Sequence, residues 1–105
     1  MILYHATNEK GFRGIVSSGC IKPGVDGIVY LADSAGNALK FVAVRTSFRD
    51  TIYVFRVEVP DNEVSETFDH SYRYFKCKSY GYRGNITVGD LTNTCWKYPG
   101  LGGEM

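Results

Sequence analysis

One stretch of the chain, residues 27–41, has the sequence GIVYLADSAGNALKF. Its first half is a continuous apolar run, Ile28 to Leu31, which predicts a short strand covered on both faces. Asp33 and Ser34 are residue types that cap helix N-termini, and apolar residues recur after them at helical spacing. The stretch therefore predicts a strand that runs directly into a helix. Small-molecule sites often form at such a junction, because the first N–H groups of the helix are unpaired. Tyr30 lies at this junction.

Composition limits the class of protein. The 105 residues fit a single domain, and the apolar and charged contents of 44% and 22% are those of a folded globular protein. A net charge of +1 predicts no general attraction to nucleic acid or to a membrane surface. No apolar run approaches the roughly 20 residues that span a bilayer, and no signal peptide is recognisable. Three cysteines without a CxxC pair predict neither a disulfide framework nor a metal site, so we expect a cytoplasmic protein.

The rest of the chain predicts more strands than helices. A strand is expected over residues 1–5, and a helix that Asn8 begins and a Ser-Ser-Gly turn ends at Gly19. Alternating apolar residues predict a strand over Thr51 to Val59. Later segments are expected to be an irregular acidic stretch at 63–71, a strand near Tyr72 to Phe75, a Gly- and Tyr-rich loop at 79–84, a strand at 85–91 and a loose tail at 98–105. The predicted architecture is α+β, with two short helices and a mostly antiparallel sheet that is split by a cleft.

Two motifs in this order resemble the ADP-ribosyltransferase family, in its diphtheria-toxin and poly-ADP-ribose-polymerase branch. The tripeptide His5-Ala6-Thr7 is similar to the H-G-S/T motif of the first strand in that branch. The stretch from Gly27 to Ala38 is similar to its G-I-Y-F-A strand and the following helix. The third signature of the family is a glutamate that begins a late strand, and the best match here places Asn85 at that position. The resemblance covers most of the chain but depends on short motifs, which are informative together and weak alone.

The resemblance implies that NAD is the co-substrate and assigns roles in binding it. His5 would contact the adenosine-side ribose, Thr7 would add a hydroxyl to that contact, and the backbone of Ala6 would hold the nicotinamide carboxamide. Tyr30 would stack on the nicotinamide ring, and Phe41 is a candidate for the opposite face of the ring.

The start of the predicted helix has a further implied role. The small side chains of Ala35 and Ala38 would let the ligand approach closely. Asn37 or Ala38 would stand where the family often has a serine that binds the carboxamide. Neither residue has the hydroxyl of that serine, although Asn37 can form a hydrogen bond in its place.

Asn85 departs from the family pattern at the position that matters most for turnover. The family glutamate binds a ribose hydroxyl and stabilises the oxocarbenium-like transition state, whereas asparagine brings no negative charge. Elongation of poly-ADP-ribose is therefore not expected. An acidic group from elsewhere in the chain is an alternative, and the candidates are Glu63, Glu66, Asp69 and Asp90.

Three functions remain open at this stage. The first is mono-ADP-ribosyl transfer from NAD to a protein or nucleic acid, in a small bacterial or phage protein such as a toxin or an anti-defence factor. The second is a weakened relative that binds NAD, ADP-ribose or a partner protein without turnover. The third, and least favoured, is an RNA 2′-phosphotransferase-like enzyme, which would need several basic residues around a phosphate. Each residue also has a plain interpretation: His5 as a hydrogen-bonded strand end, Tyr30 as core and Asn85 as a turn residue.

Overall fold

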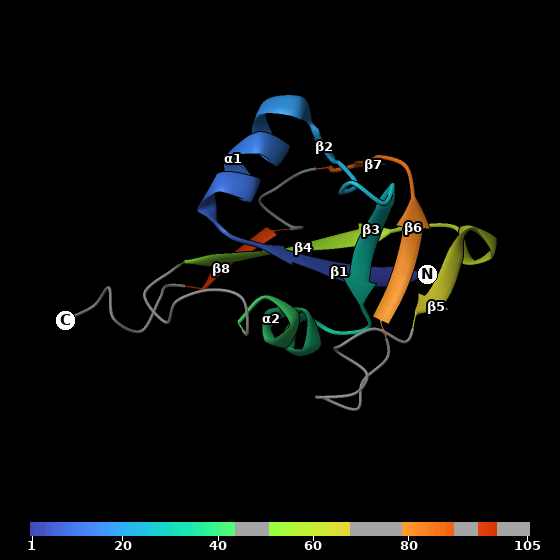
Figure 1. The fold of residues 1–105 in the computed structure, drawn as a ribbon. Coiled ribbons are helices and arrows are strands. Elements are labelled where there is room, and N and C mark those ends of the chain that lie inside the picture. Colours follow the sequence, from blue (N-terminus) through green and yellow to red (C-terminus); the bar gives the residue numbers. More distant parts are fainter. Residues whose placement is uncertain (44–50, 68–78, 90–94, 99–105) are drawn as a thin grey trace.

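A computed structural model of the chain describes residues 1–43, 51–67, 79–89 and 95–98 (Figure 1). The domain is α+β, with two helices and a mostly antiparallel sheet, as the sequence predicted. A short 3-10 helix is also present. The elements, in chain order, are β1 (Ile2–Thr7), α1 (Glu9–Ser18), β2 (Cys20–Ile21), β3 (Ile28–Ala32), α2 (Ala35–Ala43), β4 (Ile52–Glu58), η1 (Asp61–Glu63), β5 (Val64–Thr67), β6 (Ser79–Arg83), β7 (Ile86–Thr87) and β8 (Cys95–Tyr98).

The main sheet has the strand order β5-β6-β3-β1-β4-β8 and consists of two halves. Strand β1 pairs with β4 along its whole length, and β3 pairs with β6 along its whole length. Between the halves, β1 and β3 share a single register pair, Tyr4 with Ala32. Figure 1 shows β3 and β6 running across the direction of β1 and β4. The two halves therefore meet at the crossing of β1 and β3.

A second, two-stranded sheet joins β2 to β7, with Cys20 opposite Thr87 and Ile21 opposite Ile86. Both Ile21 and Ile86 are buried, so this small sheet closes the core on the side of α1.

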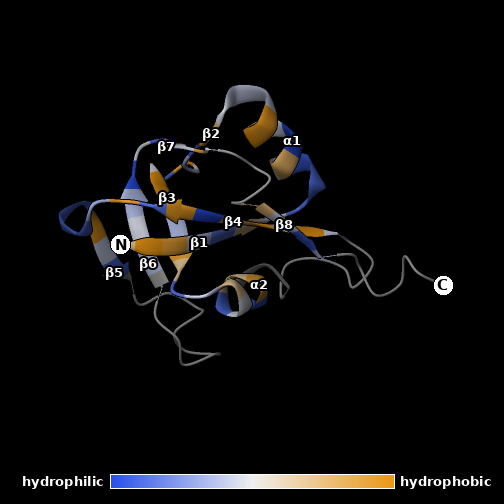
Figure 2. Cartoon of the chain, turned by 180° about the vertical axis from the view of Figure 1, so that it is seen from behind, coloured by the Kyte–Doolittle hydropathy of each residue, from blue (hydrophilic) through white to orange (hydrophobic). Residues whose placement is uncertain are grey.

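The larger core lies between α1 and the sheet. Strand alternation explains it, because successive side chains point to opposite faces. Phe12 of α1 stacks on Tyr53 of β4, with ring centroids 3.9 Å apart and planes 12° apart. Figure 2 shows hydrophobic stretches along the central strands and on both helices. The buried members of this core are Leu3, Ile15, Ile21, Val29, Leu31, Tyr53, Phe55, Val57, Val59 and Ile86.

The opposite face of the sheet carries α2. Ala32, Ala38 and Val54 are buried together there, and Tyr4 and Leu39 pack against them. The small side chains of Ala32 and Ala38 let the helix approach the strands closely. Ser34 caps this helix, because its hydroxyl accepts a hydrogen bond of 3.1 Å from the backbone N–H of Asn37.

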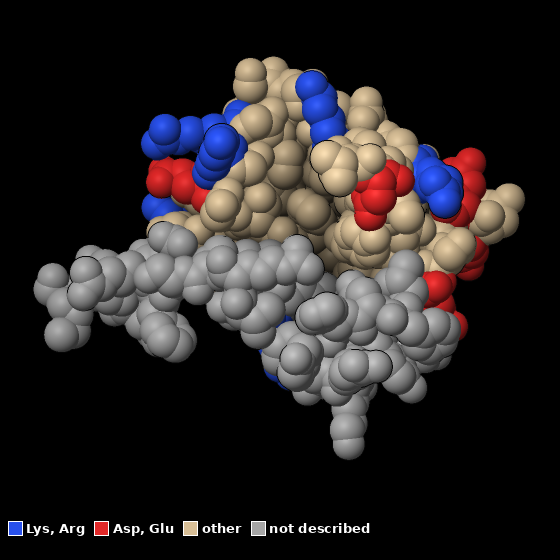
Figure 3. Space-filling view, viewed as in Figure 1, with Lys and Arg blue, Asp and Glu red and all other residues tan. Residues whose placement is uncertain are grey.

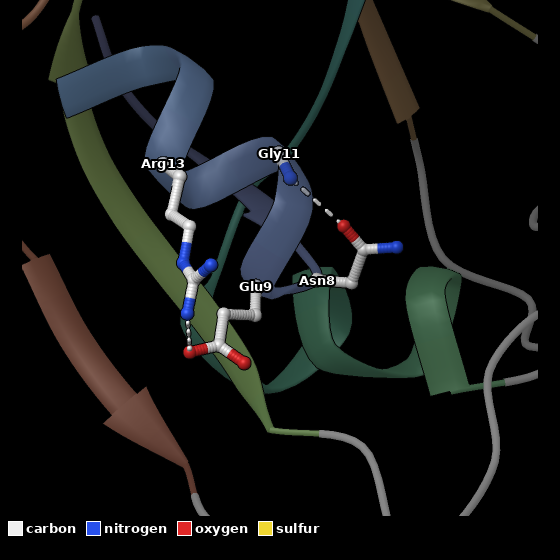
Figure 4. A network of polar contacts seen from close by, with 4 residues as sticks. All are labelled: Asn8, Glu9, Gly11 and Arg13. Carbon is white, nitrogen blue, oxygen red and sulfur yellow. Dashed lines mark hydrogen bonds and ion pairs between the residues drawn. The ribbon is translucent and has the colours of Figure 1, made fainter. Parts of the chain in front are cut away.

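Helix α1 begins and ends as the sequence predicted. The Asn8 side chain accepts a 2.9 Å hydrogen bond from the backbone N–H of Gly11, and Glu9 pairs with Arg13 one turn later (Figure 4). Gly19 ends the helix with a φ of 78°, a left-handed conformation that favours glycine.

Three predictions on the later chain need correction. Residues 79–84 were expected to form a loop, but β6 occupies most of them, because Tyr80 and Tyr82 pack on the core while Gly81 faces the other side. The stretch 63–71 was expected to be irregular, but its described part contains β5, which pairs with β6. The strand expected at 85–91 is described only as Ile86–Thr87.

Some predictions fall elsewhere in the chain. The strand near Tyr72 to Phe75 and most of the 98–105 tail lie outside the described residues. Within the described ranges, no helix has the length and apolar character needed to cross a membrane.

Replacement of Ala38 by leucine tests the packing of α2 on the sheet. The side chain of Ala38 is only 1% exposed, so added methyl groups must push the helix away from the strands. We expect Ala38→Leu to lower the free energy of unfolding by about 1–3 kcal/mol in urea denaturation. Lys40→Leu, on the exposed side of the same helix, is the control and is expected to change it by less than about 0.5 kcal/mol. Equal effects of the two substitutions would contradict the described helix orientation.

Candidate functional site

The crossing of β1 and β3 has one backbone register pair and, beside it, a hydrogen bond from a side chain. His5 follows Tyr4, the last residue of β1 that pairs with β3. Its Nδ1 lies 3.0 Å from the backbone carbonyl oxygen of Tyr30. The imidazole thus forms a hydrogen bond with the Tyr30 carbonyl next to the one residue pair that joins the backbones of β1 and β3. This contact brings together the two residues around which the sequence motifs are built.

The same hydrogen bond determines the tautomer of His5. A carbonyl oxygen only accepts, so Nδ1 must carry the proton, and in the neutral ring Nε2 then has a lone pair. Burial lowers the pKa of His5 below its ordinary value of 6.5, and the bond to the Tyr30 carbonyl opposes this effect only in part. His5 is therefore a neutral imidazole at pH 7, with Nε2 as a hydrogen-bond acceptor.

A cavity of about 280 Å³ lies beside His5, between β1, α1 and β2. His5 and Thr7 both line it, because they are two residues apart on β1 and share the face that carries α1. Figure 3 shows this side of the molecule hollowed between α1 and the β2–β7 pair. The other lining residues are Gly11, Gly14, Ile15, Ser18, Cys20, Ile21 and Lys22.

Two of the four α1 residues that line this cavity are glycines. Gly11 and Gly14 are three residues apart and lie on one face of the helix. A Cβ on Gly11 would overlap the Thr7 hydroxyl, so glycine is required for the described position of that hydroxyl. A Cβ on Gly14 would meet no atom within 4 Å. Gly14 therefore leaves space that packing does not need, and it lowers the helix propensity of α1.

The side chain of Tyr30 projects from the opposite face of the sheet, the face that carries α2. Tyr30 is two residues before Ala32, which packs under α2, so alternation places its ring on that side. The sequence predicted full burial for this strand, but the Tyr30 side chain is 39% exposed. Its hydroxyl donates a 2.6 Å hydrogen bond to Oδ2 of Asp26. This bond is the largest factor that lowers the pKa of Asp26, and the backbone N–H of Ile28 lowers it further.

The start of α2 uses its residues for packing and capping. Ala38 is buried and Ala35 packs against the same small core, so the structure gives both small side chains a packing role. The side-chain Nδ2 of Asn37 donates a 2.8 Å hydrogen bond to Oδ1 of Asp33. Ala6 also packs on this core from β1. Phe41 belongs to α2, but its side chain lies outside the described residues.

Asn85 is not on the strand that pairs with β3 beside Tyr30. It is exposed and precedes β7, which pairs with β2 and not with the main sheet. The register of these two strands, continued by one residue, sets Asn85 opposite Lys22 at the cavity. The late strand beside Tyr30 is instead β6, which begins at Ser79 and sets Gly81 opposite Tyr30. The alternative acidic residue Glu66 lies on β5, opposite Tyr80, and Glu63 is in η1. Asp69 and Asp90 lie outside the described residues.

Sequence reasoning missed several groups at this site. Asp26 was missed because a turn aspartate carries no signal of its own, although its place four residues before Tyr30 was visible. Gly11 and Gly14 were taken only as parts of a helix, yet two glycines at this spacing are unusual in a ten-residue helix. The described residues contain no group of three His, Cys, Asp or Glu side chains suited to a metal ion.

Comparison of the chain with protein-family models, with curated proteins and with solved structures gave no match.

The pH dependence of stability tests the environment of His5. Because burial lowers the pKa of His5 in the folded state, the unfolded chain binds more protons as the pH falls through about 6.5. The contribution of His5 to stability is therefore present above that pH and is lost below it. We expect the melting temperature of the wild type to fall more steeply than that of His5→Asn between about pH 7.5 and about pH 5. Parallel curves would show that the His5 pKa is not lowered by folding.

Proposed function

We propose that the protein binds NAD at the crossing of β1 and β3 and transfers ADP-ribose from it to a macromolecular acceptor. The observation that carries this proposal is the hydrogen bond from His5 to the Tyr30 carbonyl, beside a cavity that His5 and Thr7 line. It joins the two motifs on which the resemblance to ADP-ribosyltransferases rests. The proposal includes a protein or nucleic acid as the acceptor and a toxin or phage anti-defence setting. These two parts rest on the sequence resemblance and not on the structure.

The cavity suits one part of a dinucleotide. Pockets for whole drug-sized ligands are about 300–1,000 Å³, and this cavity of about 280 Å³ is slightly smaller. A ribose hydroxyl is a hydrogen-bond donor, and the lone pair on Nε2 of His5 is a matching acceptor. The hydroxyl of Thr7 offers a second polar contact, and Lys22 offers a positive charge to a phosphate. The adenosine-side ribose is therefore assigned to this cavity.

The nicotinamide ring is assigned to the exposed face of Tyr30. The two sites adjoin, because the His5 ring contacts the Tyr30 backbone while the side chains leave opposite faces of the sheet. In the transfer, the bond between the nicotinamide nitrogen and C1′ of its ribose breaks, nicotinamide leaves with the bonding electrons, and an acceptor nucleophile bonds to C1′.

The proposed reaction requires a negative charge that stabilises the cation formed at C1′. Asn85 has none, and it precedes β7, which pairs with β2 and not with β3. This observation favours the second candidate, a protein that binds NAD or ADP-ribose with little turnover. The phosphotransferase alternative has less support, because Lys22 is the one lysine or arginine among the described residues that line the cavity.

Titration with NAD tests the proposal. A ligand that binds only the folded state raises the free energy of unfolding, by about 2.7 kcal/mol at a hundred times its dissociation constant. We expect millimolar NAD to raise the melting temperature of the wild type. Intact-mass measurement with NAD and a cell lysate then separates the two candidates, since a transferase adds ADP-ribose to an acceptor and a pure binder does not.

The variant Gly14→Ala is expected to stabilise the free protein and to weaken its binding of NAD. Alanine in place of a helix glycine is expected to stabilise the free protein by about 0.8–1.0 kcal/mol. The added methyl group lies at the cavity, so the rise in melting temperature caused by NAD should shrink. Ser17→Ala, on α1 but away from the cavity, is the control and should keep the full NAD effect. No effect of NAD on the wild type would refute NAD binding, and a full effect in Gly14→Ala would exclude the cavity as its site.

A further inference from the structure

The cavity beside His5 has a positive lining. Among the described residues that line it, Lys22 is the one with a formal charge at pH 7, and none is an aspartate or a glutamate. Within the same ranges Lys22 forms no ion pair, whereas Arg13 on α1 is paired with Glu9. An unpaired ammonium group at a cavity attracts anions, and added salt weakens the attraction. The lining therefore favours a ligand that carries negative charge.

The short strand β2 fixes the place of Lys22. Ile21, the residue before it, is 1% exposed and pairs with Ile86 of β7. Cys20, Ile21 and Lys22 all line the cavity, although the side chain of Lys22 is itself exposed. The backbone next to Lys22 is thus anchored in the core, while the ammonium group can reach a ligand from the rim of the cavity.

The polar groups of the cavity combine one acceptor with two groups that can donate. Nε2 of His5 is the acceptor, because Nδ1 holds the ring proton. The ammonium group of Lys22 donates, and so can the hydroxyl of Thr7, which has no hydrogen-bond partner among the described residues. The Ser18 hydroxyl is already used in a 2.8 Å bond to the carbonyl of Gly14. A ribose with a phosphate next to a free hydroxyl matches this set, since the hydroxyl donates to His5 and the phosphate accepts from the other two.

Gly14 leaves room for the phosphate. A Cβ at this position would meet no atom within 4 Å, so packing does not require glycine there. Glycine also costs helix propensity relative to alanine. Gly14 and Lys22 line the same cavity, one from α1 and the other from β2. The missing side chain therefore enlarges the space that the ammonium group faces, which suits a group larger than a hydroxyl.

We propose that the cavity takes a ribose phosphate monoester and that Lys22 selects it, so that the protein prefers NADP to NAD. This inference rests on the proposed function in taking a nicotinamide dinucleotide as the ligand. NADP differs from NAD by a phosphate on the 2′ oxygen of the adenosine-side ribose, and that ribose is the part assigned to this cavity. A basic side chain near the 2′ oxygen is a general means of accommodating this phosphate.

Two pairs of probes test the selection. NAD and NADP differ only in the 2′-phosphate, whereas adenosine 2′-phosphate and adenosine 5′-phosphate carry the same charge at different positions. Dissociation constants for the intact protein are measured by NMR titration at low salt. A charge-assisted hydrogen bond from an exposed cation corresponds to about five-fold to about thirty-fold in affinity, and we expect NADP to bind more tightly than NAD by a factor in that range.

The adenosine phosphates test the position of the charge. Adenosine 2′-phosphate should bind more tightly than adenosine 5′-phosphate, because its phosphate adjoins the ribose hydroxyl that His5 accepts. The largest changes in backbone amide shift should fall on the cavity residues Gly14, Cys20 and Lys22.

Variants assign the preference to its source. Lys22→Gln keeps a hydrogen-bonding end and removes the charge, so it should bring the affinity ratio of NADP to NAD close to one. Lys22→Arg keeps the charge and should retain a preference for NADP. Lys10→Gln is the matched control, because it removes the same charge from an exposed α1 residue that does not line the cavity, and it should leave the ratio as in the wild type. Added salt, which needs no variant, should lower the ratio in the wild type.

Equal affinity of the wild type for NAD and NADP, or for the two adenosine phosphates, would overturn the inference. So would an unchanged ratio in folded Lys22→Gln, the result expected if Lys22 contacts the pyrophosphate that both dinucleotides share. These outcomes are separate from failure of the proposed function. If NAD binds as tightly as NADP, only the selection is refuted. If adenosine 2′-phosphate binds with the expected Lys22 dependence but neither dinucleotide binds, the phosphate site stands and the proposed function fails.

Discussion

The hydrogen bond between Nδ1 of His5 and the carbonyl of Tyr30 is the contact on which the account of the site depends. Strands β1 and β3 share a single register pair, and each is otherwise paired within its own half of the sheet. The imidazole donates a hydrogen bond to a backbone carbonyl of β3, on the far side of the single register pair. In doing so it fixes its own tautomer, and its Nε2 becomes an acceptor beside the cavity. The hydrogen bond thus adds to the Tyr4–Ala32 pair between the sheet halves and sets the protonation of the ring.

The site combines two different surfaces. On the α1 side, the two glycines of the helix and the residues of β1 and β2 enclose a small cavity with hydroxyls and one lysine. On the α2 side, Tyr30 offers an exposed ring that Asp26 holds by its hydroxyl. Sugar and phosphate chemistry suits the first surface, and stacking of a flat ring suits the second. A dinucleotide carries both kinds of group, and the proposal of NAD as the ligand rests on this combination.

Much of the fold could be predicted from local patterns, and the parts that failed had a weaker signal. The ends of α1 at Asn8 and Gly19 and the strand β4 were predicted correctly. Helix caps and the burial of one strand face depend on residues that are close together in the sequence. Strand β6 was missed because its Gly81 resembles a turn residue, while its burial depends on pairing with β3, far away in sequence. For the same reason the sequence suggested that His5 and Tyr30 act together but could not place Asp26 on the Tyr30 hydroxyl. The described part of the strand expected at 85–91 pairs with β2 rather than β3, a matter of topology that residue patterns do not encode. The role of Asn85 stays a prediction.

The most direct measurement is long-range ¹⁵N NMR of the His5 ring, with and without NAD. The account predicts that the free protein holds His5 as the neutral Nδ1–H tautomer at pH 7, with an unprotonated Nε2. Saturation with NAD should shift the Nε2 resonance through its new hydrogen bond while Nδ1 remains protonated. A ring protonated on Nε2 in the free protein would contradict the bond to Tyr30. An Nε2 signal that stays unchanged at saturating NAD would contradict the role of His5 in binding the ligand.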